Sequence, residues 1–532
     1  MASNAGILKL SNELLRIILD QIEADPEKLV GLDRRSYLSQ ESFKPPPLPS
    51  PNQAQDIGHF RLTCRRFSEL GAIHQFARVT TRFSRKGFKR LENIAGQAHL
   101  AKHVKKFSYM VPYFYVEGRE RVREVLPGLQ ERLGPLDVLH YDQKIKEQKD
   151  ILKSEEDARV LKQALLAFTS LQHVQILRVQ DQQDGLLLNY IRQRDDLGHL
   201  VELNWAPACS HSTKTLGAAL LASHSPCSRF SSPMLSPQSA IFLANHPPKA
   251  LSAVAERLTG LELHFDDGID LDNKMRDLSG LFRLFFTAAV NMQAVHVGFP
   301  SHRPLSLKLE EVFHNVRWEK LLAFGIQAWR LDAEEIIALA KRHRERLKGL
   351  RLRDVLLKEG SLWKDVLKFL RDDMHRLDWV SLRRIGYTTH FDQQWAVGAE
   401  VPDDPPGGAS ESDDESDGGW DPHAEADEEA GPSNSNYHHV EGDDESDNTS
   451  SDDEPDTEDE NGPEAEGMDF PVLSPDTPST APWCDCNGRS SYLDSPESLG
   501  DNGIFVSNVQ RKMWEKWVVR RCPEHSPQPG HK

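Results

Sequence analysis

The chain has 532 residues, of which 38% are hydrophobic and 27% charged, and its formal net charge is −18. This average hides two unlike parts. Residues 400–469 hold 28 of the 82 acidic residues and no Lys or Arg, so the remainder carries 64 basic against 54 acidic residues. No stretch approaches 18 consecutive apolar residues, which argues against a membrane-spanning helix. Six cysteines are too few for a disulfide framework, so we predict a cytoplasmic or nuclear protein.

The chain lacks the short motifs of common enzyme classes. It contains no glycine-rich phosphate loop, no G-x-S-x-G and no H-E-x-x-H. Nothing in this set of motifs argues for an enzyme. We predict a non-catalytic protein with no cofactor and no membrane contact, and we do not favour nucleic acid as a partner.

Two segments near the N-terminus have helical patterns. In residues 7–22 apolar side chains recur every three or four positions, and Ser11 stands where an N-cap belongs. Residues 23–56 are polar and carry the proline-rich run 45–49, which cannot be helix interior. The helical pattern returns at 57–77, so we predict a helical unit over 7–77 with an insertion at 23–56. Residues 78–170 are predicted to form a mixed, mainly helical connector, in which the aromatic run at 107–115 favours a strand.

The middle of the chain repeats the pattern L-x-x-L-x-L. Five matches start at Leu258, Met292, Leu321, Leu347 and Leu377, with spacings of 34, 29, 26 and 30 residues. Weaker matches are Val174-Leu177-Val179, Leu200-Leu203-Trp205 and Phe230-Pro233-Leu235, and helical stretches lie between the matches. A short strand followed by a helix at this period is typical of a solenoid, whose units share one core. We predict such a solenoid over 171–395; the alternative is an irregular α/β domain with leucine-rich strands.

The C-terminal third divides into an acidic and an ordered part. Residues 398–480 are too polar and too charged to form a core, so we predict disorder. In 481–532 the segment 503–521 regains an apolar helical face with Val506, Val509, Met513, Trp517 and Arg520. Leaving its two tryptophans in water is costly, so we expect this helix to dock on the body.

The first 80 residues resemble an F-box. The first helix of that motif has a Leu-Pro-x-Glu-Leu/Ile-Leu pattern, and this chain reads Leu10-Ser11-Asn12-Glu13-Leu14-Leu15. The later part reads Leu62-Thr63-Cys64-Arg65-Arg66-Phe67, followed by Leu70. Ser11 replaces the usual proline, and the insertion at 23–56 is a second departure. Together with the repeats, the chain is similar to fungal F-box-like proteins with irregular leucine-rich repeats. The resemblance predicts an α/β chain: an F-box-like helical unit, an irregular leucine-rich-repeat-like solenoid and a long disordered acidic insert.

The resemblance implies a substrate-recognition adaptor of an SCF-type ubiquitin ligase. In that family the F-box docks on a Skp-type linker of the cullin complex, and the downstream domain captures a substrate protein. The linker-facing candidates are Leu10, Leu14, Leu15, Ile18, Leu62, Cys64, Arg65 and Phe67. The alternative is that apolar residues only form the unit's own core, which we favour for Ile17, Ile22 and Leu70. Two other functions stay open: a ligase-independent interaction scaffold, and a protein that binds nucleic acid or histones.

A basic face is predicted on the strands. Residues between the leucines of a strand point away from the core, and this outward set includes Arg351, Arg353, Arg383, His296 and Gln327. Clustered arginines suit carboxylate or phosphate groups, so we predict that this face binds substrate through an acidic or phosphorylated segment. The chain's own acidic segment is one such ligand, with Ser410, Ser412, Ser450, Ser451 and Thr457 each followed by an acid three residues on. The alternative is a solvated charged face without a ligand.

Cys484, Cys486, Cys522 and His525 have the ligand types of a zinc site. Their spacing is irregular, and we favour free thiols with no bound metal.

Overall fold

The computed structural model describes residues 7–22, 51–111, 114–115, 138–178, 203–235, 237, 240, 248–265, 270–392 and 496–519. The predicted acidic segment 398–480 and the four metal-ligand candidates lie outside this range. Among the described helices, none has the length and apolar character needed to cross a bilayer.

Three helices form the N-terminal unit: α1 (Asn12–Ile22), α3 (Pro51–Thr63) and α4 (Arg65–Gln75), preceded by the short turn η1 (Ile7–Lys9). Ser11 is the N-cap of α1, as its hydroxyl accepts the Leu14 N–H at 3.4 Å. The helical stretch predicted at 57–77 begins earlier, at Pro51. It is also interrupted at Cys64, whose backbone is extended.

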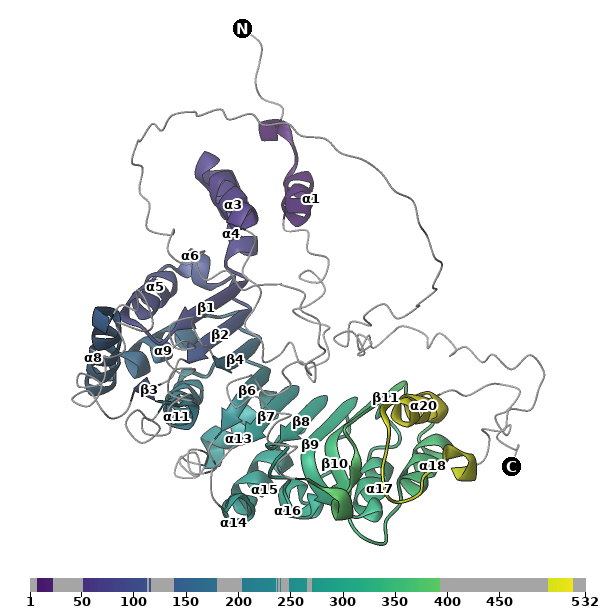
Figure 1. Cartoon of the computed structure of the whole chain (residues 1–532). Coiled ribbons are helices and arrows are strands. Elements are labelled where there is room, and N and C mark those ends of the chain that lie inside the picture. Colours follow the sequence, from purple (N-terminus) through teal and green to yellow (C-terminus); the bar gives the residue numbers. More distant parts are fainter. Residues whose placement is uncertain are drawn as a thin grey trace, which may run out of the picture. The chain divides into compact units, whose positions relative to one another are not determined.

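The rest of the described chain is built on one parallel sheet. Its strands pair in chain order, as Figure 1 shows from purple to green. They are β1 (Arg78–Arg82), β2 (Lys106–Val111), β4 (His173–Arg178), β6 (Arg229–Leu235), β7 (Gly260–Phe265), β8 (Ala294–Gly298), β9 (Ala323–Leu331), β10 (Gly349–Leu357) and β11 (Trp379–Arg383). A short strand, β12 (Gly386–Tyr387), also pairs with β10. Because parallel neighbours require a crossover, helices separate successive strands.

The helices between the strands follow the same order. They are α5 (Arg85–Ala95), α6 (Ala98–Ala101), α8 (Val138–Ser154), α9 (Glu156–Ala167), α11 (Trp205–Ser223), α13 (Pro248–Arg257), α14 (Leu271–Asp277), α15 (Ser279–Ala288), α16 (Leu309–Phe313), α17 (Ala333–Arg342) and α18 (Trp363–Asp373). The turn η3 (Thr388–His390) follows β12.

Strands β7 to β11 coincide with the five clear matches to the repeat pattern. The weaker match at Leu200-Leu203-Trp205 is wrong. There β5 (Leu203–Asn204) pairs antiparallel with β3 (Phe114–Tyr115), outside the main sheet, and Trp205 begins α11. The sheet also starts at Arg78, so β1 and β2 extend it into the range predicted as a connector.

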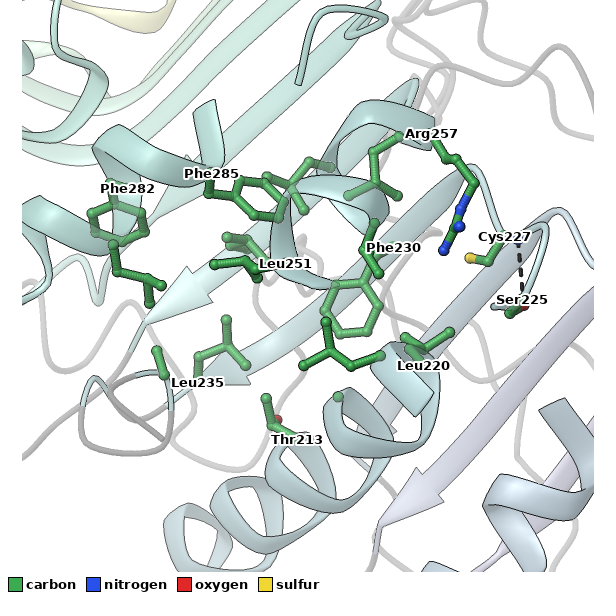
Figure 2. A pocket seen from close by; sticks show the side chains of 18 of the residues that line it. Thr213, Leu220, Ser225, Cys227, Phe230, Leu235, Leu251, Arg257, Phe282 and Phe285 are labelled. Carbon is green, nitrogen blue, oxygen red and sulfur yellow. Dashed lines mark hydrogen bonds between the residues drawn. The ribbon is translucent and has the colours of Figure 1, made fainter. Parts of the chain in front are cut away.

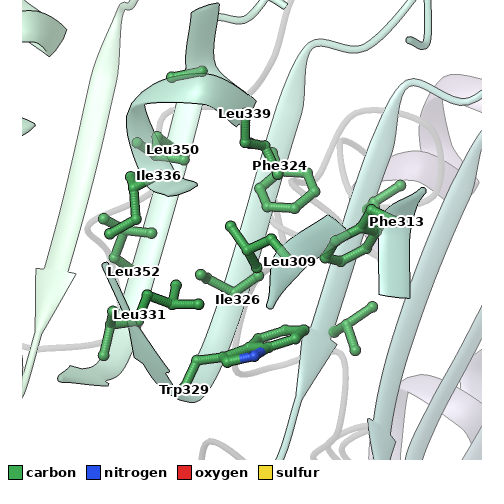
Figure 3. Close-up of a cluster of buried hydrophobic side chains, with 14 of the residues drawn as sticks. Leu309, Phe313, Phe324, Ile326, Trp329, Leu331, Ile336, Leu339, Leu350 and Leu352 are labelled. Carbon is green, nitrogen blue, oxygen red and sulfur yellow. The ribbon is translucent and has the colours of Figure 1, made fainter. Parts of the chain in front are cut away.

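The core lies between the strands and the helices that connect them. In Figure 3, Phe324 and Ile326 of β9 and Leu350 and Leu352 of β10 meet Ile336 and Leu339 of α17, with Trp329 and Phe313 beside them. These side chains are all buried. Because side chains alternate along a strand, the residues between these leucines lie on the opposite face of the sheet.

The C-terminal helix α20 (Asn508–Val519), preceded by the turn η6 (Pro496–Leu499), packs against β11 and α18. Trp514, Trp517 and Val518 are buried, and the Leu382 N–H of β11 donates to the Glu515 carboxylate. The Arg371 guanidinium lies 4.4 Å from the Trp517 ring centroid and donates to its carbonyl at 2.8 Å. The docking predicted for 503–521 is therefore present over 508–519, with Trp514 rather than Met513 at its centre.

Candidate functional site

The N-terminal helices share a small core and leave apolar side chains outside it. The core contains Leu15, Leu19, Ile57, Phe67 and Leu70, with Phe60 stacked on Phe67 at 4.3 Å between centroids. Arg66 of α4 holds the start of α1, donating to the Asn12 side chain at 2.8 Å and to the Leu10 carbonyl at 2.6 Å. The unit therefore has its own packing, and its outer residues are free for another role.

We define the apolar patch as Leu14 and Ile17 on α1 and Leu62 at the end of α3. Their side chains are 48%, 54% and 85% exposed. Leu14 and Ile17 are three residues apart and so lie on one side of α1. Such exposure of large apolar side chains is costly in water, and the spacing of Leu14 and Ile17 places two of them next to each other.

The structure divides the predicted linker-facing residues into three groups. Leu14, Leu62 and Arg65 are exposed, whereas Leu10, Ile18 and Cys64 are half-buried against the unit's core. Leu15 and Phe67 are buried in that core and do not face a partner. Ile17, which we assigned to the core, is exposed instead; Ile22 and Leu70 do pack there. The helical geometry of α1 determines which of its side chains are buried, since Leu15 and Leu19 lie one turn apart on the inner side.

The predicted basic residues come together on the second face of the sheet. Two neighbouring rows cross the strands there, one with His296, Gly325, Arg351 and Ser381 and the next with Gln327, Arg353 and Arg383. Arg384 follows directly after β11. We call Arg351, Arg353, Arg383 and Arg384, with His296 and Gln327, the arginine cluster.

The arginine cluster differs from the prediction in its exposure. Arg351, Arg353, His296 and Gln327 are buried, although they point away from the leucine core. Only Arg383 and Arg384, at the β11 end, are partly exposed. Burial, followed by repulsion from Arg383, lowers the pKa of Arg351 to about 9 despite the nearby Glu262 carboxylate. The cluster is thus a desolvated group of cations rather than a solvated surface.

Asp354 is the main carboxylate within the arginine cluster. It accepts two bonds from Arg384, at 2.6 and 2.9 Å, one from Ser301 at 2.7 Å and one from Gln327 at 3.3 Å. Asp354 has a left-handed backbone with a φ of 50°. The neighbouring Ala328 in β9 and Arg384 directly after β11 are left-handed as well, with φ of 54° and 48°. Left-handed backbone costs energy for residues other than glycine. This row of strained residues, which the sequence did not indicate, directly follows Gln327, Arg353 and Arg383.

An apolar cavity of about 120 Å³ lies between α11, β6, α13, β7 and α15. Figure 2 shows Phe230, Leu251 and Phe285 converging on it, with Arg257 and Cys227 at one end. Burial raises the pKa of the Cys227 thiol to about 11, so this cysteine is a poor nucleophile at neutral pH. Protein interiors hold few voids of this size.

One residue lining the cavity yields a stability prediction. The Thr213 hydroxyl is buried with no hydrogen-bond partner in the described chain. Thr213→Val removes this unpaired group at constant shape, and we expect the free energy of unfolding to rise by about 1 kcal/mol. Urea titration measures the change. Thr215→Val is the matched control on the same helix; its hydroxyl contacts His211 Nε2 at 3.4 Å, so that variant should lose stability. A loss in Thr213→Val would contradict the prediction.

Among the described residues there is no group of three or more His, Cys, Asp or Glu side chains that could hold a metal ion. No protein-family model matches the chain, and a search of the curated proteins finds no match.

Proposed function

We propose that this protein is a non-catalytic, substrate-recognition adaptor of an SCF-type ubiquitin ligase. In this proposal the N-terminal helices form an F-box-like unit that docks on a Skp-type linker, and the parallel sheet with its helices is a leucine-rich-repeat-like domain that holds a substrate protein. The observation that carries the proposal is the apolar patch of Leu14, Ile17 and Leu62. It lies on a helical unit whose core is already complete without it.

The physical basis is the burial of these side chains in a partner's groove. Helix-in-groove recognition uses apolar residues spaced three or four apart on one side of a helix, as Leu14 and Ile17 are. Fully burying a leucine stabilises a complex by about 1.5 to 3 kcal/mol. Arg65 follows Leu62 by three residues, and its side chain is 94% exposed and can make a polar contact at the rim.

The test is binding of the full chain to a purified Skp-type linker, measured by calorimetry. The double variant Leu14→Asp, Leu62→Asp places charges on the patch and should weaken binding at least about 100-fold, because two apolar contacts are lost. The matched control is Leu284→Asp with Val290→Asp, which are also exposed apolar residues but lie in and just after α15. This control should bind like the wild type.

Two results would contradict the proposal. The first is a folded wild-type chain that shows no binding, which would favour a ligase-independent scaffold. The second is equal binding by the patch variant and the wild type, which would place any linker contact elsewhere. Circular dichroism of each variant confirms that the helices remain folded.

A further inference from the structure

The arginine cluster contains a buried guanidinium that is incompletely hydrogen-bonded. Arg353 is 4% exposed, and its Nε has no hydrogen-bond partner within the described chain. Its charge neighbours are Arg351, Arg383 and Arg384, against the single carboxylate of Asp354. Burying a cation is costly unless an opposite charge and hydrogen bonds compensate for it.

The nearby carboxylates already have partners. Asp354 is bound by Arg384, Ser301 and Gln327, and the Glu262 carboxylate accepts the Ser231 hydroxyl at 3.0 Å and lies near Arg351. These two carboxylates are therefore already engaged by other groups, and a bound anion would lower the cost of burying Arg353.

His296 is a second buried residue of the arginine cluster that supports a ligand at this position. His296 is 2% exposed, and its Nδ1 has no hydrogen-bond partner in the described part of the chain. Burial, then repulsion from Arg351 and Arg353, holds the pKa of His296 well below its ordinary value, so the ring is neutral. A neutral imidazole that carries its proton on Nδ1 can donate a hydrogen bond to a bound oxyanion.

We propose that the arginine cluster is a binding site for a phosphomonoester dianion, carried on a phosphorylated serine or threonine of an acidic peptide. Arg353 provides the central guanidinium, and Arg351 of the same strand, Arg383 of β11 and His296 of β8 surround the phosphate. A phosphoserine carries about −1.5 to −2 charges at neutral pH, opposite in sign to the buried Arg353, and arginine binds phosphate oxygens in a bidentate manner. The partly exposed Arg383 and Arg384 give the ligand its way in from the β11 end. This site is independent of linker docking.

The probe is a labelled synthetic peptide with the sequence of residues 446–460, SDNTSSDDEPDTEDE, phosphorylated at the position of Ser450. Its affinity for the full, unphosphorylated chain is measured by fluorescence anisotropy. We expect the phosphopeptide to bind at least 10-fold more tightly than the same peptide without phosphate. Equal affinities would overturn the proposal, because acidity alone would then explain binding.

Two variants test the residues. Arg353→Gln should weaken phosphopeptide binding at least 10-fold, and Arg383→Gln should weaken it as well. The matched control is Arg344→Gln, an exposed arginine next to Glu345, which should leave the affinity unchanged. Without the peptide, Arg353→Gln should raise the melting temperature, since it removes a buried guanidinium that is incompletely hydrogen-bonded. Unchanged binding in both cluster variants, or a lower melting temperature with unchanged binding in Arg353→Gln, would overturn the site.

The phosphate can come from the chain's own acidic segment or from another protein, and one further experiment distinguishes these two sources. The full chain is phosphorylated by an acidophilic kinase and titrated again with the phosphopeptide. At least 10-fold weaker binding assigns the site to the chain's own acidic segment as an internal ligand. Unchanged binding assigns it to a phosphorylated segment of another protein.

Discussion

Trp514→Ala is expected to lower the free energy of unfolding by about 3 to 5 kcal/mol, which is the usual range for removing a buried tryptophan. The ring is fully buried in the main core, and its Nε1–H donates to the Leu499 carbonyl at 2.9 Å. Truncation leaves a cavity at the junction of α20 with β11 and α18, and it removes one of the two hydrogen bonds that the Leu499 carbonyl of η6 accepts. Both effects act on the same small region, so the loss is large.

Urea titration and hydrogen exchange of residues 508–519 measure this effect. The matched control is Phe505→Ala in the same segment; its side chain is 67% exposed, so its removal should change stability by less than about 0.5 kcal/mol. If Trp514→Ala were as mild as the control, α20 would not belong to the folded core.

Acidification should destabilise the protein through His343. The ring is buried, its Nε2 accepts the Trp318 N–H at 3.2 Å, and its Nδ1 donates to the Leu339 carbonyl at 3.1 Å. Burial, together with the charges of Arg342 and Arg317, lowers the pKa of His343 to about 4 in the folded chain, although the hydrogen bond to Leu339 raises it. The folded state therefore keeps the ring neutral, while the unfolded state protonates it below about pH 6.5.

The direction of the change in stability with pH follows from the linkage between proton binding and unfolding. Above pH 6.5 both states are neutral at this residue, and stability is unaffected. Between pH 6.5 and 4 the unfolded state binds the extra proton, so stability falls, by about 3 kcal/mol in total below pH 4.

Urea titrations from pH 7.5 to 4 on the wild type and His343→Gln isolate this contribution from that of the carboxylates. The variant should lose about 3 kcal/mol less than the wild type over this range. His390→Gln, an exposed histidine on η3, is the control and should follow the wild type. Parallel curves for wild type and His343→Gln would contradict the assignment.

Much of the sheet follows from the sequence, because a strand that faces a helix layer must repeat apolar residues at every second position. That rule located β7 to β11 from residues such as Leu350 and Leu352. It failed at Leu203, where Leu203 and Asn204 pair antiparallel with Tyr115 and Phe114 and the helix begins at once. It also gave the wrong phase in β4, where Val174 and Ile176, not Leu177, face the core.

The candidate sites were predicted less completely. The spacing of Arg351 and Arg353 placed them on one face, and the structure brings them together with Arg383, His296 and Gln327. Their burial was not predictable. The alternating pattern indicates on which face of the sheet a side chain lies, but it does not indicate which residues cover that face. On α1 the pattern contained enough apolar residues for two faces, and only packing decides that Leu15 is inside and Ile17 outside.

The position of α20 has a consequence for synthesis. The Leu382 N–H at the free edge of β11 is satisfied by Glu515, which lies 133 residues further along the chain. Parallel strands that pair in chain order can assemble as a nascent chain leaves the ribosome, but this last edge stays open until residue 519 has emerged. A chain terminated prematurely before residue 496 would therefore expose unpaired strand backbone at β11, which is a template for aggregation.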